Sequence, residues 1–372
     1  MVVLGLDKSR NNLLDVTFQI ANPQVGSSDK GIAQNEPASD IITFTAADII
    51  SAKDMANTVI TRKLSFAHLR TVIVGEELAK STVFHNIIGS SIRDPEMRRE
   101  INLVVSKEKA TDFIHANKPK LETRPHKYYA FMQERWRDTG YVPYATLNRY
   151  FQRLGGELYL AIYATAKRNE KYKEDEDDYL AGQVPQKSGN PIQIMGSAVF
   201  KQGKMIGTLS GEETRYALYL RRKSLAYTFL ASYPDPLDRK YRVSLRVIKD
   251  GNTRIDIDVE KDPPQIKVTV PVKAQIYSIP SLINYASDVE KQQLLKQSMM
   301  QGWEVKTSQL IKKRNSNSKR NLLSGMWKRG ENFGHGRIMK HMIGKPNIEM
   351  QKCRFSMIWK SKVGGKNYNL LR

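Results

Sequence analysis

Paired carboxylates are the first residues in this sequence that could do chemistry, because one acid can donate a proton while its neighbour accepts one. Such pairs occur at Glu76 and Glu77 and at Glu212 and Glu213. Adjacent residues of a helix point about 100° apart, so the two members of a pair cannot address one substrate. We therefore interpret both pairs as acids in the first turn of a helix, where negative charge is favourable.

Histidine and cysteine are the residues that would hold a transition metal. The histidines fall at His68, His85, His115, His126, His335 and His341. None pairs with another at the spacing that places two ligands on one helix face. The single cysteine, Cys353, excludes an intrachain disulfide and a cysteine-based zinc site. We predict no metal site and no cofactor.

Two other catalytic motifs are incomplete. A phosphate-binding loop needs closely spaced glycines between a strand and a helix, followed by lysine and serine or threonine. The nearest segment, Gly334 to Gly336, lacks the third glycine and a preceding strand. In GTLSG, Ser210 stands one position away from that of a hydrolase nucleophile and is better explained as a helix cap. The sequence predicts that the protein is not an enzyme.

Most of the positive charge lies in a C-terminal tail. The whole chain has a net charge of +22, and residues 291–372, with 19 Lys and Arg and three Glu, contribute +16 of it. Such a tail could contact phosphate groups, with Trp327 available for stacking. It would equally be attracted to anionic lipid, or it could stay solvated with no ligand. A basic nucleic-acid-binding protein is the alternative function. If the folded part of the chain bound nucleic acid, residues 1–305 alone would bind DNA in a salt-dependent way. We predict that residues 1–305 do not bind DNA.

The elements that position these residues begin with strands alternating with helices. Residues 2–6 and 14–21 predict a hairpin through the polar segment SRNN. Residues 69–74 predict a buried strand that ends at Gly75. A helix over residues 48–60 would bury the apolar stripe formed by Ile49, Ala52, Met55 and Val59. Asp94 is expected to cap one helical turn, with Pro95 at its first position.

The C-terminal half opens with a predicted hairpin, residues 193–200 and 205–209, and then two helix-start signals. Ser210 with Glu213, and Ser287 with Glu290, have the spacing of a capping box. The second box would start a long helix whose buried stripe is Leu295, Met299, Trp303 and Leu310. Gly302 weakens this helix by about 1 kcal/mol relative to alanine, so a break is expected to be possible there.

Residues 241–274 carry the clearest strand pattern and predict an antiparallel meander with one wet face. Asp250 and Gly251 are the expected tight turn between its first two strands. Leu245, Ile257 and Val268 fall on the apolar face, and replacing Ile257 with Asp should cost several kcal/mol by burying an unpaired charge.

These patterns predict an α+β fold, with antiparallel sheets, packed helices and at least two domains. The acidic run from Glu174 to Asp178 and the Gly, Pro, Gln and Ser residues after it mark the main boundary. We predict domains over residues 1–185, with a subdivision near residue 118, and 192–313. Residues 314–372 form the basic tail, for which we expect poor order.

Five segments in register extend this interpretation. They are GLDK from Gly5, VTFQIANP from Val16, HLRTVIVGEELAKS from His68, RDPEMRREINLVVSKEKATDFI from Arg93, and GSAVFKQGKMIGTLSGEETRYALYLRRK from Gly196. The first four resemble the N-terminal domain, and the fifth the start of the C-terminal domain, of the C subunits of bacterial spore nutrient germinant receptors, the Ger(x)C lipoprotein family. The resemblance covers about residues 1–310.

The resemblance identifies a set of family-motif positions that we expect to specify the fold rather than to contact a ligand. They are Gly5, Asp7, Lys8, Gly75, Glu76, Arg93, Asp94, Gly196, Phe200, Gly207 and Glu213. It implies a non-catalytic accessory subunit needed for nutrient-triggered germination. Its expected partners are two membrane-embedded subunits, A and B, at the outer face of the inner spore membrane, and no nucleic-acid partner is implied.

The sequence departs from the family pattern near both ends. Family members begin with a signal peptide and a lipid-accepting cysteine, whereas this chain starts in the first strand with no cysteine nearby. We expect the DNA just upstream to encode a basic segment, an apolar stretch and a cysteine, and the chain as written to stay soluble. After Phe333 to His341 the alternating strands of the family are missing, which suggests an altered or frame-shifted 3′ end.

Overall fold

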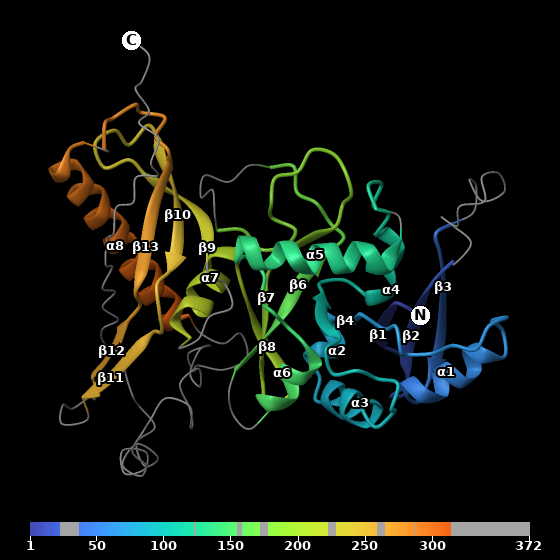
Figure 1. Ribbon diagram of the computed structural model, residues 1–372. Coiled ribbons are helices and arrows are strands. Elements are labelled where there is room, and N and C mark those ends of the chain that lie inside the picture. Colours follow the sequence, from blue (N-terminus) through green and yellow to red (C-terminus); the bar gives the residue numbers. More distant parts are fainter. Residues whose placement is uncertain are drawn as a thin grey trace. The chain divides into compact units, whose positions relative to one another are not determined.

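The computed structural model describes residues 1–22, 37–122, 124–154, 158–171, 178–221, 228–258, 265–285 and 287–313. Two compact units divide this part of the chain, and each is considered by itself (Figure 1). Unit 1 comprises residues 1–136 and 141–214, and unit 2 comprises residues 137–140 and 215–313. The basic tail, residues 314–372, lies outside the described residues.

An eight-stranded sheet forms the centre of unit 1, in the order β3-β2-β1-β4-β5-β6-β7-β8. Its strands are β1 (Val3–Lys8), β2 (Leu14–Ala21), β3 (Ser39–Ala46), β4 (Thr71–Gly75), β5 (Asn102–Ser106), β6 (Tyr159–Thr165), β7 (Gln193–Lys201) and β8 (Lys204–Leu209). The predicted hairpin β1–β2 is confirmed. Its turn places Asn11 and Asn12 at φ values of 55° and 58°, a conformation that asparagine tolerates.

The four central strands, β1, β4, β5 and β6, run parallel, and the strands on either side of them pair antiparallel. Parallel neighbours need a crossover connection, which the intervening helices supply. Every residue of β4, β5 and β6 is buried, as expected for strands covered on both faces. The predicted α+β class with antiparallel sheets is confirmed, and the parallel centre is an addition to it.

The helices between these strands are short except for α5, whose last residues belong to unit 2. They are α1 (Ile49–Asn57), α2 (Glu76–Ala79), α3 (Val83–Ser91), α4 (Ala110–Ala116), α5 (Pro125–Thr139) and α6 (Leu147–Gln152). The predicted stripe of α1 was wrong at two positions. Met55 and Val59 are 44% and 63% exposed. The buried residues of α1 are Ile49, Ala52 and Ala56, and the helix ends at Asn57, before Val59.

Unit 2 is built on a three-stranded sheet, β13-β10-β9, and a long helix. Its elements are β9 (Thr228–Pro234), β10 (Arg242–Lys249), β11 (Arg254–Asp258), β12 (Gln265–Thr269), β13 (Val272–Ser278) and α8 (Val289–Lys312), while α7 (Gly211–Leu220) crosses the division after Thr214. The predicted stripe of α8 is confirmed, because Leu295, Met299, Trp303 and Leu310 are all buried. The helix runs through Gly302 without a break.

The predicted meander was wrong in its pairing. β10 pairs with β13 and β9, whereas β11 and β12 form a separate two-stranded ribbon. Gly251, at φ 131°, lies between β10 and β11, which do not pair with each other. The N–H of Asp250 donates to the carbonyl of Pro271, so the chain continues its ladder there. Leu245 and Val268 are fully buried, and the side chain of Ile257 lies outside the described part of the structure.

Two local predictions about helix starts were also wrong. Asp288, not Ser287, caps α8 by accepting the N–H groups of Glu290 and Lys291, because a carboxylate one residue later meets the same free donors. The Asp94 carboxylate does accept the N–H of Glu96, as a cap would, but the chain after it makes turns and no helix. The capping box of Ser210 and Glu213 is confirmed in both directions.

The predicted boundary between residues 185 and 192 falls between β6 and β7. Those two strands pair within one sheet, and unit 1 continues to Thr214. The division of the chain into family domains over residues 1–185 and 192–313 stays a prediction.

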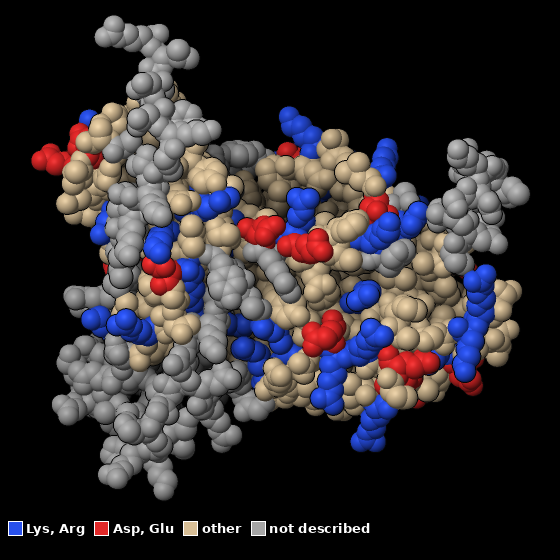
Figure 2. All heavy atoms as spheres, in the orientation of Figure 1, with Lys and Arg blue, Asp and Glu red and all other residues tan. Residues whose placement is uncertain are grey.

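The surface of the described residues mixes both signs of charge. On the face drawn in Figure 2, Lys and Arg side chains are interspersed with Asp and Glu. No helix in the described ranges is both long enough and apolar enough to cross a bilayer.

Candidate functional site

Two of the motif segments meet at the edge of the sheet where the parallel strands end. Asp7 and Lys8 close β1, and Gly75 closes the neighbouring strand β4, with Glu76 starting α2 directly after it. The carboxyl ends of parallel strands are where α/β proteins place binding groups. We therefore take this edge as the first candidate site.

Asp7 is buried, with 2% of its surface exposed. Its carboxylate accepts the backbone N–H groups of Ala110 at 2.7 Å and Thr111 at 3.0 Å. These are donors of the first turn of α4, whose N-cap residue, Lys109, provides no side-chain cap. Burial raises the pKa of Asp7, while the two backbone hydrogen bonds act to lower it. Asp7 thus caps a helix that lies 103 residues later in the chain.

The motif glycines of this region make room for these contacts. A Cβ atom on Gly75 would lie 2.3 Å from Oδ1 of Asp7, and one on Gly5 would lie 2.8 Å from Cδ1 of Ile114 in α4. Such distances are far inside van der Waals contact, so any larger residue would displace the aspartate or the helix. Both glycines allow α4 to lie close against β1 and β4.

Glu76 is engaged by two donors of unit 1. Its Oε2 accepts the hydroxyl of Tyr163 at 2.5 Å, and its Oε1 pairs with Lys80 one turn later. Burial, and then the hydrogen bond to Glu76, raises the pKa of Tyr163. Lys8 pairs with Glu77 at 3.1 Å on the exposed surface. No group of three potential ligands for a metal ion occurs among the described residues. The polar side chains at this edge of the sheet bind to other groups of the same chain.

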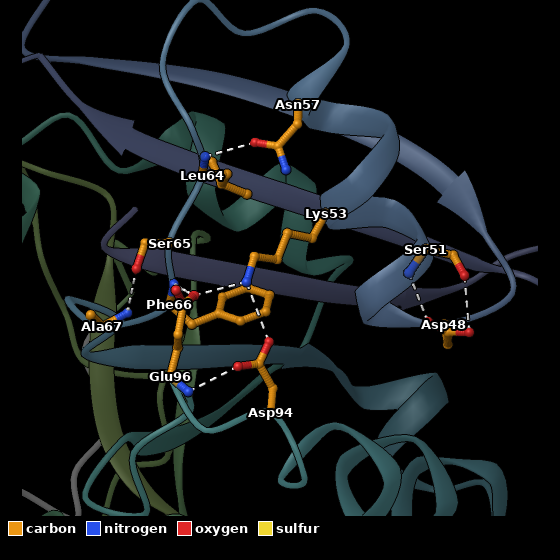
Figure 3. Close-up of polar contacts among 10 residues, drawn as sticks. All are labelled: Asp48, Ser51, Lys53, Asn57, Leu64, Ser65, Phe66, Ala67, Asp94 and Glu96. Atoms are coloured by element: carbon orange, nitrogen blue, oxygen red, sulfur yellow. Dashed lines mark hydrogen bonds and ion pairs between the residues drawn. The ribbon is translucent and has the colours of Figure 1, made fainter.

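The RDPE segment forms a second cluster around a lysine of α1 (Figure 3). The ammonium of Lys53 lies 2.8 Å from Glu96 and 3.3 Å from Asp94, and 4.4 Å from the centre of the Phe66 ring. Glu96 also accepts the N–H of Phe66 at 3.0 Å, and Asp94 that of Glu96 at 2.8 Å. Three separate segments are thereby held together. Arg93 contributes its backbone N–H to the carbonyl of Ser90.

The charges of this cluster stabilise one another. The hydrogen bond from Lys53 lowers the pKa of Glu96 to about 2. Burial alone would lower the pKa of Lys53, but its hydrogen bonds to Glu96 and Asp94 outweigh burial and raise it.

Glu96→Gln should therefore lower the melting temperature of the protein at pH 7 and change it much less in acid. The folded carboxyl has a pKa near 2, against 4.5 for its ordinary value. Its stabilising effect is present above pH 4.5 and is lost as the pH falls towards 2. Thermal melts of both proteins from pH 7 to pH 3 measure this. A difference in melting temperature between the two proteins that stays constant from pH 7 to pH 3 would contradict a stabilising Lys53–Glu96 ion pair.

The fifth motif segment forms most of the β7–β8 hairpin and the start of α7. Gly196 has φ 86°, and a Cβ there would lie 2.4 Å from the carbonyl oxygen of Leu209 in β8. Phe200 is buried with its ring 5.9 Å from that of Tyr150. Gly207 pairs with Val199 across the hairpin. Glu213 forms the capping box with Ser210 at the start of α7.

Sequence reasoning missed the residues that complete these clusters. Lys53 and Glu96 are 43 residues apart, and Tyr163 is 87 residues from Glu76. It also missed Lys249, which is buried in unit 2 and donates to the carbonyls of Tyr219 at 3.1 Å and Arg221 at 2.7 Å. Burial lowers the pKa of Lys249 to about 8. The only sequence signal for Lys249 was its position at the end of a predicted strand.

Two family models match the chain in order. "Spore germination protein N-terminal domain" covers residues 1–165, and "Spore germination B3/ GerAC like, C-terminal" covers residues 195–319. The chain belongs to the Ger(x)C family. The resemblance predicted from the motif segments is confirmed, and every motif position named above lies within a matched range.

Individual members of the Ger(x)C family are similar at low identity. Spore germination protein KC of Bacillus subtilis (strain 168) is 28% identical over 114 residues, which span 30% of this chain and 28% of that protein. Spore germination protein B3 of the same strain is 21% identical over 273 residues, 73% of this chain and 65% of the relative. Each alignment covers less than two thirds of the relative's length.

The crystal structure of the GerBC protein has a similar fold, with a TM-score of 0.52 at 17% identity over 96% of this chain and 95% of that one. At this identity the similarity establishes the fold alone. The family descriptions name spore germination and no catalytic activity. The structural role of the motif positions stays a prediction.

Proposed function

We propose that this protein is a non-catalytic subunit of a spore germinant receptor, required for nutrients to trigger germination. It acts beside membrane-embedded A and B subunits at the outer face of the inner spore membrane. The observation that carries the proposal is the match of both family models, in order, to residues 1–165 and 195–319.

The contacts of the motif residues support a scaffold rather than a chemical role. Asp7 is occupied by two backbone N–H groups and Glu76 by a hydroxyl and an ammonium. A general acid or base must reach a substrate proton, and these carboxylates face donors of their own chain. The same residues keep the elements of unit 1 in place, as a subunit that presents surfaces to partners requires.

Deleting the gene should abolish germination in response to the nutrient that this receptor senses. Spores of the deletion strain and its parent are exposed to single nutrients, and loss of refractility is followed with time. Decoated spores treated with lysozyme, which hydrolyses the cortex directly, should respond equally in both strains. Normal responses of the deletion strain to every nutrient that its parent senses would overturn the proposal.

A further inference from the structure

The outward face of α8 carries an uncharged stripe about four turns long. Six residues of the helix are buried against unit 2. On the outward side lies a stripe in which Leu294, Gln301, Val305 and Gln309 are exposed, and Ser298 and Gly302, at its margin, are half-buried. Leu294 and Val305 are 45% and 50% exposed. Solvent-facing helix surfaces normally carry charges, so an uncharged stripe with two exposed aliphatic side chains is suited to contact with another surface.

Gly302 lies in the middle of this helix, where glycine costs about 1 kcal/mol relative to alanine. A Cβ atom added there would meet no atom of the described residues within 4 Å. The packing of the described part of the chain therefore gives no reason for a glycine, in contrast to Gly75 and Gly196. Glycine in a helix surface allows the backbone of a second element to approach closely.

The two ends of the helix beyond this stripe carry opposite charges. Glu290 lies in the first turn of α8 and Lys312 in the last. Both are exposed, and neither forms an ion pair with another described residue. They are equally far from Gln301 along the helix. A second copy of α8, antiparallel and related by a two-fold axis between Gln301 and Gly302, would place each Glu290 within one helical turn of the Lys312 of the other copy.

We propose that α8 is a self-association surface, on which a second copy of this chain docks its own α8 antiparallel across Gly302. Leu294 of one copy then lies within a helical turn of Val305 of the other, and both aliphatic side chains leave water. A single pair of helices is at the small end of specific interfaces, so the dimer is concentration-dependent. This inference does not depend on the proposed receptor function.

Sedimentation of the full chain tests the proposal. The 42.5 kDa protein should reach twice its monomer mass at about 100 µM and dissociate on dilution. Gly302→Arg should weaken association at least about tenfold, because its side chain fills the crossing point. Arginine is a better helix former than glycine, so the same variant should melt at a higher temperature as a monomer. A wild-type monomer at every concentration, or an undiminished dimer of Gly302→Arg, would overturn the proposal.

A charge exchange tests the antiparallel arrangement. Glu290→Lys and Lys312→Glu should each weaken the dimer by setting like charges opposite one another. The double variant should restore association, because the pairs are re-formed with their signs reversed. Both substitutions disfavour the helix dipole of α8 itself, so a merely structural effect would make the double variant worse than either single one. That outcome would exclude the two-fold pairing.

Discussion

Trp303→Ala is expected to lower the free energy of unfolding of unit 2 by about 3–5 kcal/mol. Trp303 is fully buried under the three-stranded sheet. Its ring stacks on Phe229 at 6.1 Å and meets Tyr216 and Tyr219 edge to face at 5.5 and 5.9 Å. Its indole N–H donates to the hydroxyl of Tyr233. Truncation to alanine removes these ring contacts and leaves a cavity that the helix and sheet cannot close.

Urea unfolding followed by circular dichroism, at a protein concentration where the chain is a monomer, measures the effect, with Val305→Ala as the matched control. Val305 lies half a turn away on the same helix and is 50% exposed. Its truncation should change stability by no more than about 0.5 kcal/mol. A loss below about 1 kcal/mol for Trp303→Ala would show that the aromatic cluster does not hold α8 on the sheet.

Asp7→Ala is expected to destabilise unit 1 by about 3 kcal/mol. Hydrogen bonds to a charged group contribute about 1.5–3 kcal/mol each, and the buried N–H groups of Ala110 and Thr111 would lose their acceptor. Asp7→Asn should cost less, since its amide oxygen can still accept one of the two donors. Urea unfolding at pH 7 measures both variants.

Lys8→Ala is the control for this position. Its side chain is half exposed, and its ion pair with Glu77 lies on the surface. Exposed pairs contribute about 0–1 kcal/mol, so this variant should unfold close to the wild type. Equal losses for Asp7→Ala and Lys8→Ala would argue against a special role for the helix cap.

The sequence allowed those features to be predicted whose signal is local. Alternation identified β1 and β2, a three-residue spacing identified the capping box of Ser210 and Glu213, and helical spacing identified the buried stripe around Trp303. The pairing of β10 with β13 could not be predicted in this way, because a strand's alternation fixes its buried face and says nothing of its neighbour.

The candidate site shows the same limit. GLDK and RDPE identified Asp7 and Asp94, but nothing near them in the sequence indicates that one caps α4 and the other faces Lys53. Both partners are brought into place by crossovers between parallel strands. Such contacts depend on how the strands are ordered in the sheet. One sequence considered alone contains no residue spacing from which they could be derived.

The parallel centre of the large sheet also sets the order in which unit 1 can fold. β1, β2 and β3 are consecutive and can pair as soon as residue 46 has left the ribosome. β4, β5 and β6 join later, each after a helical connection, and β7 and β8 close the sheet as a hairpin. Until each strand arrives, its predecessor is an open edge available to other chains. Non-local pairing is slow, so we expect nascent chains that end between residues 106 and 193 to be the species most in need of a chaperone.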